Sequence, residues 1–245
     1  MKFIKLLIYY LIKKLSIVTG EVNKNDVAGA LHKSWGYIVT NFIKGDYVEF
    51  GVYKGGSFVE SYQQRLVFKE FLNQQLNHQE KWRREFMMKS NYHKFKPIFH
   101  GLDTFDGMPE NDEQNIIFEK GSYFSNYDSV KKKCLKNGIP SESFFLYKGN
   151  FKNTKNELKE NLKNRKVAIV NFDCDLYSST KEAIFSIENN LQIGSVLLFD
   201  DWNTFNADNN KGQRKAFLEF QKTTNLKFEK WFTYKYVGQA FLCTS

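Results

Sequence analysis

Five short apolar runs recur along the chain, each bounded by polar or glycine-containing stretches. They cover residues 47–50, 98–102, 144–147, 167–172 and 196–199. A short continuous apolar run between turn residues is typical of a strand that is buried on both faces of a sheet. The pattern therefore predicts five buried β-strands.

The segments between these runs are longer and charged, with apolar residues at helical spacing. They cover residues 125–136, 154–164, 178–191 and 211–223. Strands that alternate with helices predict an α/β fold, here a doubly wound, mostly parallel sheet covered on both faces. Two aromatic-rich runs, 226–233 and 236–243, follow with almost nothing between them. They predict a hairpin that adds an antiparallel C-terminal strand at the edge of the sheet.

Two segments do not fit this simple alternation. Residues 62–97 lie in a connection that is longer than a crossover helix requires, and they contain no Gly and no Pro before Pro97. We expect a helical insertion there, either one long helix or a helical pair. Residues 1–40 are expected to form an N-terminal helical extension, and the chain as a whole, 1–245, is expected to form a single domain.

The N-terminal extension begins with an apolar and basic stretch. Its longest uninterrupted apolar run, residues 6–12, is too short to cross a bilayer. The favoured interpretation is an amphipathic helix that packs on the domain or on a second subunit. A helix that lies on a membrane surface or serves as a targeting segment is the alternative.

Charge and cysteine content narrow the possible partners and the compartment. The 245 residues include 36 Lys and Arg against 27 Asp and Glu, which gives a net charge of +9. This excess favours nucleic acid, anionic lipid or a phosphate-bearing substrate as partner. The three cysteines, Cys134, Cys174 and Cys243, are far apart and odd in number. They argue against a disulfide framework and a zinc site, and they favour the cytoplasm.

Two motifs follow the first and second predicted strands. Glu49 lies near the end of the first strand, and glycines at 51, 55 and 56 follow it at the mouth of a helix, where free N–H groups can meet a ligand. This spacing departs from the G-x-G-x-x-G of nicotinamide-binding folds. Asp103 closes the second strand, where a carboxylate can accept hydrogen bonds from ribose hydroxyls. An ordinary strand-to-helix turn and a turn-forming Asp are the alternatives.

The strongest chemical pattern is a pair of acidic motifs. Asp173 and Asp175 follow the fourth predicted strand, and Asp200 and Asp201 follow the fifth. The carboxyl ends of neighbouring parallel strands meet at one edge of a sheet, so four carboxylates converge there. Such charges repel one another in a cleft, and a hard divalent cation relieves the repulsion. Helix or loop capping by one residue of each pair is the alternative, but it leaves the other unexplained.

Six motifs in order give a family resemblance. They are VEFGVYKGGS, GLDTFDGMP, GSYFS, KGNFKNT, NFDCDLYSST and GSVLLFDDWN. Over residues 41–243 the sequence resembles the macrocin O-methyltransferase family of metal-dependent sugar O-methyltransferases. The resemblance implies a Rossmann-like class I methyltransferase sheet with a reversed last strand. It also implies S-adenosylmethionine as methyl donor, Mg²⁺ or Mn²⁺ as metal, and a sugar hydroxyl as acceptor.

The resemblance also implies roles for individual residues. The methionine part of the donor would contact Glu49, Gly51, Tyr53, Lys54, Gly55, Gly56 and Ser57, the ribose would contact Asp103 and Thr104, and the adenine Asn150 and Phe151. The metal ligands would be Asp173, Asp200 and Asp201, with Asp173 also near the donor. Related catechol-type enzymes carry a catalytic Lys where this sequence has Leu176. The base is therefore expected to be Asp173 or Asp175, and the acceptor is expected to contact Asp175, Tyr177 and Arg214.

The acceptor class is the least determined part of the prediction. We favour a nucleotide-activated hexose or heptose for surface polysaccharide, with Arg214 or the basic residues of 62–96 near its phosphates. A lipid-linked or finished glycan, with the N-terminal helix near an anionic membrane, and a natural-product glycoside are alternatives. An RNA-binding methyltransferase is the less favoured alternative, and nucleic acid is not the expected partner, because the basic residues are scattered and the acidic cleft would repel a phosphate backbone. A homodimer is the expected assembly.

Overall fold

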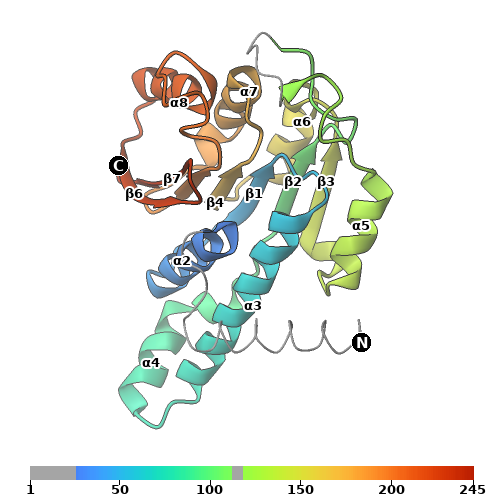
Figure 1. Ribbon diagram of the computed structural model, residues 1–245. Helices are drawn as coiled ribbons and strands as arrows, with labels where there is room; N and C mark the ends of the chain where they lie inside the picture. Colours follow the sequence, from blue (N-terminus) through green and yellow to red (C-terminus); the bar gives the residue numbers. More distant parts are fainter. Residues whose placement is uncertain (1–25, 112–117) are drawn as a thin grey trace.

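The computed structural model describes residues 26–111 and 118–245. The predictions for residues 1–25, including the apolar run 6–12, lie outside the described residues. A seven-stranded sheet with the order β3-β2-β1-β4-β5-β7-β6 forms the centre (Figure 1). The strands are β1 (Asp46–Phe50), β2 (Phe99–Asp103), β3 (Phe144–Lys148), β4 (Val167–Phe172), β5 (Val196–Phe199), β6 (Phe228–Tyr234) and β7 (Gly238–Cys243).

The strand directions confirm the predicted fold class. Strands β1 to β5 pair in parallel, and β7 pairs antiparallel with both β5 and β6. The five apolar runs and the C-terminal hairpin coincide with the observed strands to within about two residues, the usual uncertainty of element ends. The strand order reverses between β1 and β4, and ligands of open α/β sheets bind at such a reversal.

Helices cover both faces of the sheet because successive side chains of a strand point to opposite faces. On β1, Tyr47 packs in one core with α2, α3 and α5, whereas Val48 packs in the other with α6, α7 and α8. The helices are α2 (Val27–Thr40), α3 (Gly56–Leu76), α4 (Lys81–Ser90), α5 (Tyr127–Lys136), α6 (Phe151–Asn161), α7 (Tyr177–Ile187) and α8 (Gly212–Thr223). Within the described ranges, no helix is both long enough and apolar enough to span a bilayer.

A row of stacked rings crosses the ends of three neighbouring strands. Phe50 of β1 stacks on Phe172 of β4 with ring centroids 5.6 Å apart, and Phe172 stacks on Phe199 of β5 at 4.7 Å. All three are fully buried. Each is the last residue of its strand, so the row fixes the relative positions of the residues that follow.

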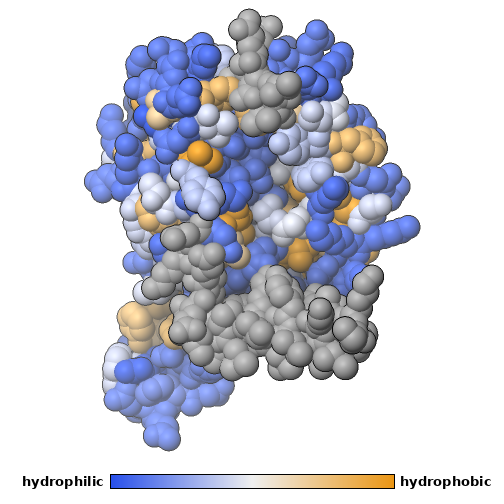
Figure 2. All heavy atoms as spheres, in the orientation of Figure 1, coloured by the Kyte–Doolittle hydropathy of each residue, from blue (hydrophilic) through white to orange (hydrophobic). Residues whose placement is uncertain are grey.

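The long connection after β1 consists of two helices. Helix α3 has 21 residues, about 31 Å of helix, and α4 packs against its far end. The pair therefore extends away from the edge where the parallel strands end (Figure 1). Its protruding tip is covered mainly by hydrophilic residues on the face seen in Figure 2.

Candidate active site

The ends of β1 and β4 approach so closely that only glycine fits after β1. Gly51 has φ +96°, and a Cβ at this position would lie 1.8 Å from the carbonyl oxygen of Asp173. The Asp173 N–H donates to the Phe50 carbonyl at 2.9 Å, and the Asp200 N–H donates to the Phe172 carbonyl at 3.0 Å. The β1 turn and the two acidic motifs thus meet at one point of the sheet edge.

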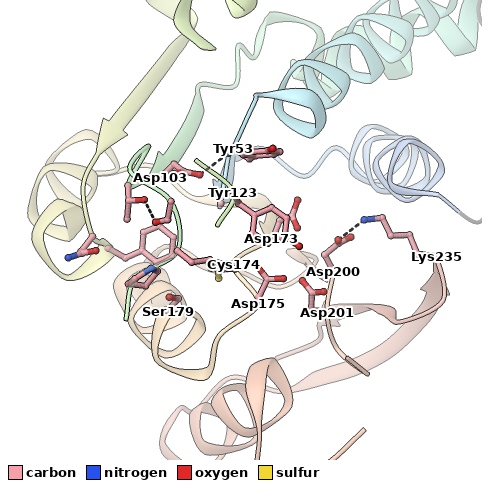
Figure 3. Close-up of a pocket in the computed structure, with 17 residues that line it drawn as sticks. Tyr53, Asp103, Tyr123, Asp173, Cys174, Asp175, Ser179, Asp200, Asp201 and Lys235 are labelled. Carbon is pink, nitrogen blue, oxygen red and sulfur yellow. Dashed lines mark hydrogen bonds and ion pairs between the residues drawn. The ribbon is translucent and has the colours of Figure 1, made fainter. Parts of the chain in front are cut away.

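A cavity of about 330 Å³ lies above this edge (Figure 3). Ten of the residues predicted from the sequence line it: Gly51, Tyr53, Asp103, Thr104, Asn150, Phe151, Asp173, Asp175, Asp200 and Asp201. They follow five different strands, and the parallel arrangement brings them together. Six further lining residues belong to the quoted motifs but had no role assigned to them: Gly107, Met108, Pro109, Tyr123, Cys174 and Ser179. Lys235 also lines the cavity and lies outside every motif.

Three of the carboxylates are close enough to share a cation. Asp173, Asp200 and Asp201 each offer one oxygen, and these oxygens lie within 4.8 Å of one another. Burial, followed by repulsion from Asp200 and the other carboxylates, raises the pKa of Asp173 well above its usual range. In the described part of the chain, Oδ1 of Asp200 and Oδ2 of Asp201 are buried without a hydrogen-bond partner. Unpartnered hard oxygens in a charged cluster fit a divalent cation.

Asp175 lies beside this cluster, next to Asp201 (Figure 3). Burial, followed by the charge of Asp201, raises the pKa of Asp175 well above its usual range. The backbone of Asp175 has φ +55°, an uncommon conformation for a residue other than glycine. Such a conformation is often found at functional sites.

Asp201 is held in place by side chains that sequence reasoning missed. The fully buried Gln213 of α8 accepts from the Asp201 N–H at 3.0 Å and donates to the Phe172 carbonyl at 2.9 Å. Thr204 donates its hydroxyl to Oδ1 of Asp201 at 3.0 Å. Groups of this kind orient carboxylates that bind metals.

Asp103 joins the first two motifs. Its Oδ2 accepts from the Tyr53 N–H and its Oδ1 from the Phe105 N–H, both at 2.7 Å. Burial raises its pKa, although these two bonds act in the opposite direction. Since a carboxylate oxygen can accept more than one hydrogen bond, Asp103 can hold the turn and still face a ligand in the cavity.

Glu49 lies beneath the cavity and does not line it. Its side chain is fully buried and accepts from the Ser57 hydroxyl at 2.8 Å, from the Asn171 amide at 3.4 Å and from the Tyr47 hydroxyl. Burial raises its pKa to about 7 despite these hydrogen bonds. Glu49 therefore links β1 to the start of α3 through Ser57.

The loop after β2 pairs with a later segment to form one wall of the cavity. The Met108 N–H donates to the Ser122 carbonyl at 2.7 Å, and the Gly121 N–H donates to the Met108 carbonyl at 2.9 Å. A Cβ on Gly107 would lie 2.5 Å from the Gly121 carbonyl oxygen. The motifs GLDTFDGMP and GSYFS are thus in direct contact.

Several predicted site residues lie outside the lining of the cavity. Lys54, Gly55 and Gly56 form the turn into α3, with Gly55 at φ +68°. Tyr177 donates its hydroxyl to Glu219 at 2.8 Å. Arg214 donates to the Asn203 side chain at 2.8 Å and lies over the Trp202 ring.

The basic stretch 62–96 contributes no residue to the lining of the cavity within the described ranges. It belongs to α3 and α4, which extend away from the strand ends (Figure 1). The structure therefore does not support the expectation that its basic residues lie near the phosphates of an acceptor. Among the residues that the structure describes, Lys235 is the cation that lines the cavity.

Comparisons with known proteins identify a family for this chain. The family model described as Macrocin-O-methyltransferase (TylF) matches residues 22–229. A search of curated proteins found no match.

Solved structures show the same fold. The O-methyltransferase NovP is 17% identical with a TM-score of 0.65, and the match covers 89% of this chain and 79% of NovP. The calicheamicin methyltransferase CalS11 is 18% identical with a TM-score of 0.61, over 88% and 77%. TomG from Streptomyces achromogenes, solved in complex with S-adenosylmethionine, is 11% identical with a TM-score of 0.52, over 89% and 79%.

Proposed function

The chain belongs to the macrocin-O-methyltransferase family and is an S-adenosylmethionine-dependent O-methyltransferase, and from this premise we propose that it methylates a sugar hydroxyl with the help of a divalent metal. The observation that carries the proposal is the cluster of Asp173, Asp200 and Asp201 at the floor of the cavity. Two of its oxygens are buried without a partner in the described part of the chain.

In the proposed mechanism, Asp173, Asp200 and Asp201 hold the metal, which when bound supplies Lewis acidity toward the acceptor hydroxyl. Asp103 holds the ribose of the donor, and the Gly51 turn lets its methionine part approach the backbone. Asn150 and Phe151 border the adenine. The acceptor oxygen forms a bond to the methyl carbon as the bond from that carbon to sulfur breaks, and the sulfur keeps the electron pair.

The hydroxyl proton goes to a carboxylate of the chain. We assign this role to Asp175, because Asp173 is assigned to the metal and Leu176 is an apolar buried residue. Asp175 lines the cavity beside Asp201 (Figure 3). Positioning and electrostatics are expected to supply most of the rate, because methyl transfer to an activated oxygen needs no covalent intermediate.

We further propose a nucleotide-activated hexose or heptose as acceptor, for surface polysaccharide synthesis in the cytoplasm. A CalS11 structure is described as that of a TDP-rhamnose 3'-O-methyltransferase, which supports this acceptor class. Lys235 provides a cation at the cavity. The three cysteines are free thiols, which supports a reducing compartment. A homodimer stays a prediction.

Methyl transfer to a panel of nucleotide sugars tests this function. The protein is incubated with S-adenosylmethionine, Mn²⁺ and each sugar, and the products are analysed by mass spectrometry for the gain of one methyl group. Asp200→Asn is expected to lower turnover by about a hundredfold or more, since it removes a charged metal ligand. Donor binding, measured by calorimetry, is expected to change little.

The matched control is Glu229→Gln, which removes an exposed carboxylate from β6. It is expected to behave like the wild type. Full activity of Asp200→Asn, or of the wild type in excess chelator, would remove the metal from the mechanism. Methylation of a finished glycan or a glycoside, but of no nucleotide sugar, would change the acceptor class.

A further inference from the structure

The turn between β6 and β7 brings a lysine to the acidic cluster. β6 ends at Tyr234 and β7 begins at Gly238, and Lys235 follows β6 with φ +48°. The Asn203 N–H donates to the Val237 carbonyl at 3.0 Å and fastens the turn to the segment after β5. The backbone of Lys235 is therefore fixed beside the acidic segment that follows β5.

The two oxygens of Asp200 are in different situations. Oδ2 accepts from Nζ of Lys235 at 2.6 Å, whereas Oδ1 is buried and has no partner among the described residues. Figure 3 shows Lys235 reaching Asp200 from the side opposite Asp175. Oδ1 therefore has both lone pairs available for a further ligand, whereas Lys235 takes one lone pair of Oδ2 and stands in the way of a ligand on that side.

We propose that Lys235 is a positioning residue of the metal site: it holds Oδ2 of Asp200, so that this carboxylate binds the cation through Oδ1 alone. The inference rests on the proposed function, because it requires a metal at Asp173, Asp200 and Asp201. A cation with about six ligands keeps about three positions for acceptor and water if each of the three aspartates supplies one oxygen. If Asp200 bound the cation through both of its oxygens, about two positions would remain for acceptor and water.

The charge of Lys235 has a second consequence. Asp173, Asp175, Asp200 and Asp201 bring four acidic groups to the cavity, so a single divalent cation does not balance them when all are ionised. Lys235 supplies additional positive charge at Asp200. Like charges repel, so this lysine weakens the binding of the metal while it keeps more of the coordination shell open.

Manganese binding to the full-length protein tests the proposal without any turnover. Free Mn²⁺ is measured by electron paramagnetic resonance, and the water bound to the protein-held ion is measured by proton relaxation. For Lys235→Met, we expect about tenfold tighter binding, and a relaxivity of the bound ion that falls by about a third as one of three waters is lost. Lys235→Leu, which also lacks a donor, is expected to behave like Lys235→Met, and Lys235→Arg is expected to retain the wild-type values.

Lys230→Met is the matched control, because Lys230 is exposed on the same hairpin. Unchanged relaxivity in both Lys235→Met and Lys235→Leu, with binding intact, would overturn the role of Lys235 and leave the metal site standing. Weaker binding in these variants would also overturn this role. A wild-type protein that binds no Mn²⁺ would overturn the metal site itself, and the two failures are thus distinguishable.

Discussion

At the scale of the single residue, Gly51 determines whether the strand ends can meet. Its φ is +96°, and a Cβ would overlap the carbonyl oxygen of Asp173. We expect Gly51→Ala to lower the free energy of unfolding by at least about 2 kcal/mol, because both the clash and the positive φ oppose a side chain. Urea unfolding measures this effect.

Gly56 provides the control for this prediction. It is the first residue of α3, and nothing lies within 4 Å of a Cβ built there. Gly56→Ala is expected to leave the free energy of unfolding nearly unchanged or slightly raised. Equal losses in both variants would mean that the contact between Gly51 and Asp173 has no special importance.

Glu49 makes stability depend on pH. Burial raises its pKa from 4.5 to about 7, so the folded protein retains a proton that the unfolded chain releases. The contribution of Glu49 to stability is therefore present below about pH 4.5 and is lost as pH rises to about 7. Relative to the wild type, Glu49→Gln is expected to gain up to about 3 kcal/mol of unfolding free energy across this window.

Urea unfolding of both proteins at several pH values, without donor and with chelator, measures this difference. The difference in unfolding free energy between the two proteins isolates Glu49, since the aspartates of the cavity titrate in both. A difference that stays constant between pH 4.5 and 7 would show that Glu49 ionises near its ordinary pKa.

At the scale of the element, the strands and the residues at their ends could be predicted, because they depend on the local pattern of apolar and polar residues. Residues 167–170 and 196–199 are continuous apolar runs, as expected for strands covered on both faces, and they lie in β4 and β5. Asp173 and Asp200 follow directly, so their convergence could be predicted from the parallel arrangement alone.

Contacts that depend on packing between distant elements could not be predicted in the same way. Lys235 reaches Asp200 only because β7 pairs with β5 and its hairpin partner ends beside the cavity. Gln213 reaches Asp201 only because α8 packs over the end of β4. Neither residue belongs to a motif, and nothing near it in the sequence distinguishes it from the other lysines and glutamines.

The position of the basic stretch 62–96 likewise depends on packing between distant elements. The composition of residues 62–96 shows positive charge, but the direction in which a helix leaves the sheet depends on its packing. Leu72 of α3 and Met87 of α4 are buried in the core shared with α2, and this packing carries the pair away from the cavity. Net charge therefore did not identify the cation that lines the site.

At the scale of the whole molecule, the described elements pack on the two faces of one sheet, which supports the proposal that the chain forms one methyltransferase domain. The α3–α4 pair leaves this body at the end remote from the cavity (Figure 1). Because α4 lies far from the cavity, we expect substitutions on α4 to leave donor binding intact. Substitutions at the sheet edge that lines the cavity are expected to weaken it.

Thermal unfolding with and without S-adenosylmethionine measures this separation. At a donor concentration of about 100 times its Kd, the wild type is expected to gain about 2.7 kcal/mol, and its Tm is expected to rise by about 5 to 10 °C. Trp82→Ala, at an exposed position of α4, should show the same rise, and Asp103→Ala should lose most of it. NAD should leave Tm unchanged, since the glycines lack its spacing. A rise that disappears in Trp82→Ala would instead make the α3–α4 pair part of the donor site, through a coupling over the length of α3.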